Sequence, residues 1–153
     1  MSSTPDPTVT ISLTCKPASD ALAFYASAFN AKELYRLAMP DGSVAHGEFM
    51  IGSTRLLISD EAPDSFAFAM PEGVSASCIF SIATNDCDRA FHQAVEAGAT
   101  PLTQPENFFW GSRSASVRDP FGYRWSFSQV VEELTPEEIG ARARKFMGGS
   151  AED

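Results

Sequence analysis

The sequence predicts an α+β fold made of two βαβββ modules followed by a C-terminal helix. Segments in which apolar and polar residues alternate are typical of strands, and apolar residues three or four positions apart are typical of helices. The same order of such segments occurs twice along the chain. Turn-forming glycines separate strands within each copy. With 153 residues, of which 44% are hydrophobic and 20% charged, the chain has the composition of a globular protein.

The pattern divides the chain into six segments. They are a frayed leader at 1–7, a first βαβββ module at 8–60, a linker or flap at 61–76, a second βαβββ module at 77–130, a C-terminal helix at 131–147 and a tail at 148–153. The linker contains two prolines and a glycine, which favour irregular structure between the modules.

The first module begins with a strand in which alternate residues are apolar. Four of them are expected on one face: Val9, Ile11, Leu13 and Cys15. A helix follows, and Ser19 or Asp20 is expected to cap its start. The expected bounds are 9–15 for the strand, 18–30 for the helix, and 31–39, 44–51 and 54–60 for three further strands. The pairs Asp41-Gly42 and Gly52-Ser53 predict the turns between these strands.

The second module repeats this order. Its expected bounds are 77–84 for the strand, 86–97 for the helix, and 100–103, 112–118 and 123–129 for the last three strands. At an offset of 68 residues, Asn30 falls on Gly98 and Leu57 falls on Trp125. Asparagine and glycine best tolerate the left-handed C-cap of a helix, so the match has a physical reason. We interpret the pattern as a duplication; a coincidence between two unrelated hairpin regions is the alternative. The first strands match less well, since their apolar faces differ by one residue.

The C-terminal helix has its own start signal. Thr135, Pro136 and Glu138 form the pattern of a capping box, in which the threonine caps the helix and the glutamate reaches back. Acidic residues at its start and basic residues at its end suit the helix dipole. The helix lies outside the repeat, so core packing or a contact in a homodimer is its expected role.

The net charge of −9 excludes one large class of partners. A body this acidic repels a polyphosphate backbone, so nucleic acid is not expected as a partner. No apolar run reaches the ~20 residues of a membrane span, and no secretory signal is recognisable, so a membrane is not expected either. The three cysteines contain no Cys-x-x-Cys pair and suit a reducing cytoplasm.

His46 and Glu48 are the strongest candidates for chemistry. They lie two residues apart on an expected strand, so both side chains point to one face. A histidine beside a carboxylate can hold a proton near neutral pH, which makes the two residues candidate catalytic groups. A solvated strand face, or a structural histidine bonded to its neighbour, is the alternative.

An aromatic segment provides candidates for ligand binding. Phe109 and Trp110 precede a strand and would form a wall of a pocket, with the indole N–H as a donor. Packing under a hairpin, or a subunit contact, is the alternative. Arg113 would suit a carboxylate or phosphate on a ligand, although an ion pair with one of the many acids is equally consistent.

The chain resembles the vicinal oxygen chelate superfamily, which includes glyoxalase I, bleomycin-resistance proteins and extradiol dioxygenases, and within it the PhnB-like branch. The resemblance covers about residues 8–147. Its motifs are Ala21-Leu22-Ala23-Phe24-Tyr25, Met39-Pro40-Asp41-Gly42, His46-Gly47-Glu48-Phe49, Phe109-Trp110-Gly111 and Asp119-Pro120-Phe121-Gly122. It implies a glyoxalase-like fold in which two paired βαβββ modules enclose a cup, and a homodimer.

The resemblance also implies where a metal would bind. Metal-dependent relatives take one ligand from the first and one from the last strand of each module, and the final ligand is a glutamate seven residues after the Asp of Asp-Pro-x-Gly. Here that position holds Ser126, and its repeat mate is Ile58, while the first-strand positions fall near Ile11 and Ile79. Such residues do not hold a divalent cation, so no metal site and no cofactor are predicted. Ser126 stays as a candidate ligand-binding residue, and a divalent metal stays as the alternative.

Two functions are consistent with these residues. The first is a glyoxalase- or bleomycin-resistance-like protein that binds a small molecule in the cup without the usual metal. The alternative is a lyase or isomerase in which His46 or Glu48 moves a proton next to a carbonyl, with Trp110 and Arg113 nominated to stabilise the enolate. The sequence does not decide between them and does not name the ligand.

Overall fold

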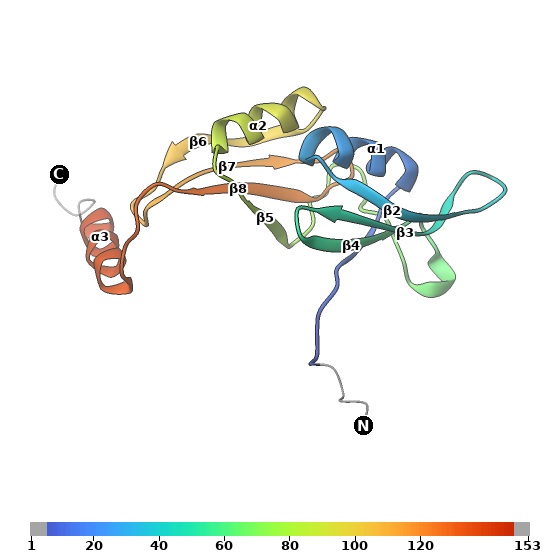
Figure 1. Ribbon diagram of the computed structural model, residues 1–153, viewed down its shortest axis with the longest axis horizontal. Coiled ribbons are helices and arrows are strands. Elements are labelled where there is room, and N and C mark those ends of the chain that lie inside the picture. The colour runs from blue at the N-terminus through green and yellow to red at the C-terminus, as the bar shows by residue number, and fades with distance from the viewer. Residues whose placement is uncertain (1–5, 149–153) are drawn as a thin grey trace. The chain divides into compact units, whose positions relative to one another are not determined.

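The computed structural model describes residues 6–148 (Figure 1). The chain divides into two compact units, Met1–Pro71 and Glu72–Asp153. The division falls inside the segment 61–76 in which the sequence suggests a linker. Of the predicted leader and tail, residues 1–5 and 149–153 lie outside the described part of the chain.

The first unit is a four-stranded mixed sheet with one long helix. The strand order is β1-β4-β3-β2; β1 runs parallel to β4, and the other neighbours are antiparallel. The elements are β1 Ser12–Thr14, α1 Ala18–Phe29, β2 Lys32–Ala38, β3 Val44–Ile51, β4 Thr54–Ser59 and a short 3-10 helix, Pro63–Ser65. Tyr25 of α1 stacks on Phe49 of β3 with ring centroids 5.5 Å apart, which fixes the helix on one face of this sheet.

The second unit repeats this topology and adds a helix. The strand order is β5-β8-β7-β6, with β5 parallel to β8 and the other neighbours antiparallel. The elements are β5 Ile79–Ala83, α2 Cys87–Glu96, β6 Thr100–Asn107, β7 Ser112–Arg118, β8 Arg124–Val130 and α3 Pro136–Gly148. α2 lies along one face of its sheet, whereas α3 stands beyond the strand ends (Figure 1). The predicted α+β fold of two βαβββ modules and a C-terminal helix is therefore confirmed.

The number of residues that separates equivalent positions of the two modules is 68 for the third strands and 69 for the fourth strands. Buried Phe49 of β3 corresponds to buried Val117 of β7, 68 residues later, but buried Ile58 of β4 corresponds to buried Phe127 of β8, 69 residues later. The turn between β7 and β8 is longer than that between β3 and β4 and contains the extra residue. The predicted match of Leu57 with Trp125 is therefore wrong by one position. A separation of 69 residues also aligns the first strands, β1 and β5.

Local capping signals in the sequence are confirmed at three helix ends. Asn30, the C-cap of α1, and Gly98, which follows the C-cap Ala97 of α2, have the positive φ that the pattern predicts, 56° and 115°. At α3, the Glu138 N–H donates to Thr135 Oγ1 at 3.2 Å, and the Thr135 N–H donates to Glu138 Oε2 at 2.8 Å. These reciprocal bonds form the predicted capping box.

The N-terminal cap of α1 differs from the prediction. Neither Ser19 nor Asp20 caps the helix; both belong to its first turn. Instead, Asp60 at the end of β4 accepts the Ala18 N–H at 3.1 Å. Its second carboxylate oxygen accepts the N–H of Val44 at 2.7 Å. A residue that is distant in sequence therefore supplies the cap, which local patterns do not reveal.

Three elements have a bound that differs from the expectation by more than two residues. β1 begins only at Ser12, so Val9 and Ile11 are exposed while Leu13 and Cys15 are buried. β6 extends to Asn107 despite two prolines, because an edge strand needs few backbone donors. α3 begins at Pro136, not at 131, and ends at Gly148. None of the helices within residues 6–148 has the length and hydropathy of a membrane span.

Candidate functional site

His46 and Glu48 lie on the face of the first sheet that α1 does not cover. They alternate along β3 with Gly47 and Phe49, which are buried on the helix side. His46 Nε2 lies 3.1 Å from Glu48 Oε1, within hydrogen-bond distance. The two side chains therefore share one face and form a pair, and 41% of the His46 side chain is exposed.

Arg55 completes a cluster of three charged or titratable groups. Its Nη1 donates to Glu48 Oε2 at 2.9 Å from the neighbouring strand β4. The hydrogen bond from His46 and then that from Arg55 lower the pKa of Glu48. Ionised Glu48 can only accept, so His46 Nε2 must carry the shared hydrogen. His46 Nδ1 then faces away from the carboxylate and is the nitrogen available to a ligand.

Two large apolar side chains of β2 lie beside this cluster. Tyr35 is the cross-strand partner of Glu48, and Leu37 is the partner of His46, so all four share the open face. The rings of Tyr35 and His46 lie 6.3 Å apart. Tyr35 is 53% exposed and Leu37 is 48% exposed, which is unusual for residues of this size. Together they provide an apolar surface next to a hydrogen-bonding group.

Tyr35 and Leu37 were not among the residues predicted from the sequence, although one signal points to them. In a hairpin centred on Asp41-Gly42, residues equidistant from the turn pair across the strands. That rule places Leu37 opposite His46 and Tyr35 opposite Glu48, as the structure does.

The aromatic segment Phe108–Gly111 connects β6 to β7 in the second unit. Trp110 stacks on Phe108 with ring centroids 4.3 Å apart and keeps 39% of its surface exposed. Phe109 packs on Phe146 of α3 at 5.3 Å. The carbonyl oxygen of Gly111 accepts two backbone N–H groups of the segment that leads to α3, at 3.0 and 3.1 Å. The segment therefore joins α3 to the sheet, and Trp110 still presents part of its ring to solvent.

Arg113 is held by an acid of α2. Its Nε and Nη2 donate to the two carboxylate oxygens of Asp88 at 2.6 and 2.8 Å, and its Nη1 donates to Asn107 Oδ1 at 3.2 Å. The guanidinium lowers the pKa of Asp88. Arg113 lies two residues before buried Ala115 on β7, so both side chains are on the helix side of the sheet. The structure thus shows the ion pair that the sequence left open as the alternative to ligand binding.

Ser126 lies on the open face of the second sheet. It pairs with Ser81 of β5 and Ser116 of β7. Because of the one-residue shift, its equivalent in the first unit is Leu57 on the open face, not buried Ile58 as predicted. Ser126 could hydrogen-bond a ligand through its hydroxyl.

The positions equivalent to metal ligands do not suit a cation. On the open faces of the first and last strands, these positions hold two cross-strand pairs, Ser12 with Leu57 and Ser81 with Ser126. Divalent metals in proteins are bound by imidazole, thiolate or carboxylate groups, and these residues offer none. Within residues 6–148, no three His, Cys, Asp or Glu side chains gather into a group that could hold a metal ion.

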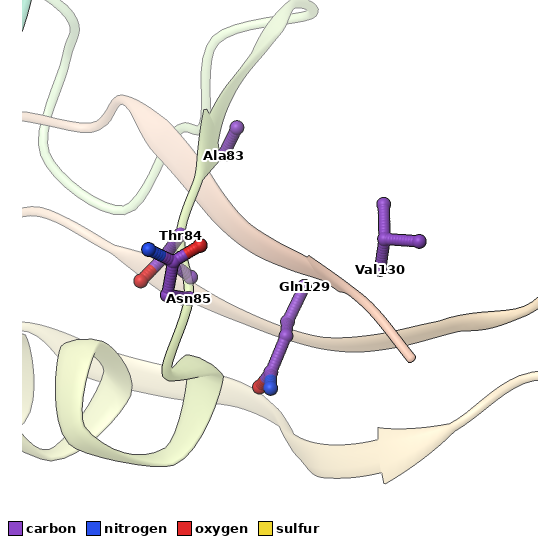
Figure 2. Close-up of a pocket in the computed structure, with 5 residues that line it drawn as sticks. All are labelled: Ala83, Thr84, Asn85, Gln129 and Val130. Atoms are coloured by element: carbon purple, nitrogen blue, oxygen red, sulfur yellow. The ribbon is translucent and has the colours of Figure 1, made fainter. Parts of the chain in front are cut away.

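A pocket of about 340 Å³ lies where β5 ends and α2 begins (Figure 2). Its lining residues are Ala83, Thr84, Asn85, Gln129 and Val130. Gln129 Oε1 accepts the N–H of Cys87 at 3.0 Å, so the side chain also caps α2. The lining offers hydroxyl and amide groups but no ionised side chain. No sequence-predicted candidate lines the pocket, because it joins segments that are distant in the sequence.

The chain matches known proteins over most of its length. Residues 8–127 match the Glyoxalase/Bleomycin resistance protein/Dioxygenase superfamily. The chain is 33% identical over 139 residues to the uncharacterised protein Mb0911c of Mycobacterium bovis, a match that covers 89% of this chain and 91% of that protein. It is 30% identical over 126 residues to the uncharacterised protein At5g48480 of Arabidopsis thaliana, covering 77% of this chain and 75% of that protein.

Solved structures show the same fold. The crystal structure of the Arabidopsis protein At5g48480 superimposes with a TM-score of 0.64 and 25% identity, covering 80% of this chain and 98% of that one. A PhnB protein from Bacillus cereus superimposes with a TM-score of 0.64 and 15% identity, covering 80% of this chain and 99% of that one. The chain therefore belongs to the Glyoxalase/Bleomycin resistance protein/Dioxygenase superfamily, also called the vicinal oxygen chelate superfamily.

Proposed function

We propose that the protein binds a small organic molecule on the open face of its first sheet, as a metal-independent, bleomycin-resistance-like member of the PhnB-like branch. The observation that carries this proposal is the juxtaposition of the His46–Glu48–Arg55 cluster with exposed Tyr35 and Leu37. A site of this kind combines apolar contact area with a few fixed polar groups, as small-molecule sites usually do.

The geometry suggests which molecule would fit. The ring of Tyr35 and the side chain of Leu37 favour a flat or aliphatic group that gains from burial. His46 Nδ1 favours a hydroxyl or N–H donor on that molecule when the imidazole is neutral. Taken by itself, the second unit offers the exposed ring of Trp110 and the hydroxyl of Ser126 as candidate ligand contacts, whereas its Arg113 is held by Asp88.

Proton transfer is a second candidate function, favoured by the hydrogen bond between His46 and Glu48. The carboxylate fixes the tautomer of the imidazole and would stabilise the imidazolium that forms when Nδ1 takes a proton. A lyase or isomerase would use this base next to a carbonyl. Arg55 is half-exposed and pairs with Glu48, so it is the candidate to stabilise an enolate, whereas Arg113 is engaged by Asp88.

Thermal-shift screening of a library of small organic molecules tests the binding proposal. Compounds that raise the melting temperature of the wild type should lose this effect in His46→Ala and Tyr35→Ala. The matched control is His92→Ala, because His92 is the other histidine of the chain and is exposed on α2. Stabilisation that persists equally in His46→Ala and His92→Ala would place the site elsewhere.

Deuterium exchange then separates binding from catalysis. For a bound compound with a C–H group next to a carbonyl, proton NMR in deuterated water measures the loss of that hydrogen. An enzyme should accelerate the exchange, and His46→Ala should abolish the acceleration while Glu48→Gln reduces it. A compound that binds through His46 without accelerated exchange leaves binding as the function.

We also infer a homodimer formed through α3. The helix buries no residue, and its apolar side chains recur at helical spacing along one stripe: Ile139, Ala143, Phe146 and Met147. Acids are concentrated at its start and bases at its end. A second α3 packed antiparallel would cover the stripe and bring opposite charges together, which favours another copy of this chain as the partner.

A reducing cytoplasm is the location that we propose. Its support is that none of the three cysteines forms a disulfide within residues 6–148; Cys15 and Cys87 are buried and Cys78 is exposed.

A further inference from the structure

Two arginines lie side by side on the open face of the second sheet. Arg118 at the end of β7 and Arg124 at the start of β8 are direct cross-strand partners. They alternate with buried Val117 and Trp125, so both point away from α2. Side chains in such a pair start about 5 Å apart, and like charges at that spacing repel each other.

No carboxylate within residues 6–148 forms an ion pair with either guanidinium, although the chain has a net charge of −9. Other arginines do have such partners: Arg36, Arg55, Arg113 and Arg142. Arg124 Nη2 reaches only the carbonyl oxygen of Ser77, at 3.4 Å. Its Nε is buried without a hydrogen-bond partner. A buried donor without an acceptor is costly. A bound anion would supply the acceptor that this pair of arginines lacks.

A row of hydroxyl groups crosses the sheet next to this pair. One residue from each strand contributes to it through direct pairing: Ser81 of β5, Ser126 of β8, Ser116 of β7 and Thr103 of β6. Thr103 Oγ1 and Ser116 Oγ lie 2.8 Å apart and share a hydrogen bond. Each hydroxyl can donate and accept, so the row suits a molecule that carries hydroxyl groups.

We propose that Arg118 and Arg124 bind the phosphate or carboxylate group of a small organic anion whose hydroxyl groups contact Ser126 and its neighbours in the row. Guanidinium groups present N–H donors in a fixed fork that matches both kinds of oxyanion. The inference rests on the proposed function of the open faces, but it uses residues of the second sheet alone.

The test measures melting temperature against increasing concentrations of glycerol 3-phosphate, glycerate and inorganic phosphate, at constant ionic strength set with chloride. We expect saturable stabilisation of the wild type by at least one organic anion. The two organic probes distinguish a phosphate from a carboxylate ligand. The double variant Arg118→Gln/Arg124→Gln should weaken the apparent affinity at least tenfold. Arg89→Gln, which removes one positive charge from an exposed position of α2, should leave it unchanged.

A second variant tests the hydroxyl row. Ser126→Ala should weaken binding of the hydroxylated anions several-fold and leave binding of inorganic phosphate unaffected. Without any anion, the double arginine variant should melt at or above the temperature of the wild type, because a like-charge contact has been removed. A merely structural role of the arginines predicts a lower melting temperature instead.

The inference is overturned if no anion stabilises the wild type, or if stabilisation survives in the double arginine variant. Its failure is distinguishable from failure of the proposed function. Library compounds that depend on His46 and Tyr35, together with no response to these anions, would uphold the proposed function and reject the anion site. Anion binding that depends on Arg118 and Arg124, without any compound whose binding depends on His46, would uphold the anion site and reject the proposed function.

Discussion

The carboxylate of Asp119 accepts the indole N–H of Trp125 at 2.9 Å in the core of the second unit. Both residues are almost fully buried, with Asp119 3% exposed. The other carboxylate oxygen accepts the backbone N–H groups of Phe121 and Tyr123 at 2.8 and 2.9 Å. One acid therefore fixes the turn between β7 and β8 and the largest side chain of the core.

Replacing Asp119 should destabilise the protein severely. Asp119→Ala leaves one buried and two part-buried donors without an acceptor, and we expect a loss of about 2–4 kcal/mol in the free energy of unfolding. Asp119→Asn keeps one acceptor for the backbone donors but turns an N–H₂ group towards the indole, so its loss should be about half as large. Urea denaturation followed by tryptophan fluorescence measures both. A loss below about 1 kcal/mol for Asp119→Ala would contradict this role.

Gly111 should tolerate no side chain. Its φ is 88°, and a Cβ atom there would clash with the backbone carbonyl oxygen of Glu132. Gly111→Ala should therefore cost about 3 kcal/mol, the sum of backbone strain and a shift of the segment that carries α3. Gly42 is the matched control, because its φ is 85° but its Cβ position is open. Gly42→Ala should cost only about 1 kcal/mol, and equal losses in urea denaturation would refute the steric argument.

Glu48 should make stability depend on pH. Its pKa in the folded protein is lowered by His46 and Arg55 from an ordinary value of 4.5. A lowered folded pKa means that the stabilisation is complete above the unfolded value and is lost as the pH falls through the folded value. The stabilisation of the wild type over Glu48→Gln should thus be retained in full down to pH 5 and shrink below about pH 4.5.

Urea denaturation at pH 7, 5, 4 and 3 measures this difference. Because the hydrogen bond from His46 is the largest cause, a His46→Ala background should diminish the pH dependence more than an Arg55→Gln background. A difference that stays constant down to pH 3 would mean that the cluster does not hold the carboxylate ionised.

Features encoded by neighbouring residues were predictable from the sequence. The repeat of elements, the C-caps at Asn30 and Gly98, and the capping box at Thr135 each depend on local spacing. The His46–Glu48 pair was predictable for the same reason, since alternation along one strand places both side chains on one face.

Features that depend on distant residues were not predictable in this way. Asp60 caps α1 from the end of β4, and Asp88 of α2 holds Arg113 of β7. The one-residue shift between the modules arises from a longer turn between β7 and β8. The residue of the first unit that is equivalent to Ser126 is therefore Leu57 on the open face, whereas the sequence comparison had given Ile58. The register of β7 and β8 also places Arg118 directly opposite Arg124, a pairing that the sequence alone did not reveal.

Reversal of charge should control self-association through α3. In an antiparallel pair of helices, Glu137 near the start of one α3 would lie close to Arg144 near the end of the other. Glu137→Arg and Arg144→Glu should each raise the dimer dissociation constant, and the double reversal should restore it because the pair is again complementary.

Phe146→Ser should raise the constant about tenfold or more, since the side chain is 70% exposed in the single chain and would be covered in the dimer. Sedimentation velocity across a concentration series measures all four variants against the wild type. A wild type that stays monomeric, or a double reversal that fails to recover, would show that α3 does not pair with a second copy in this way.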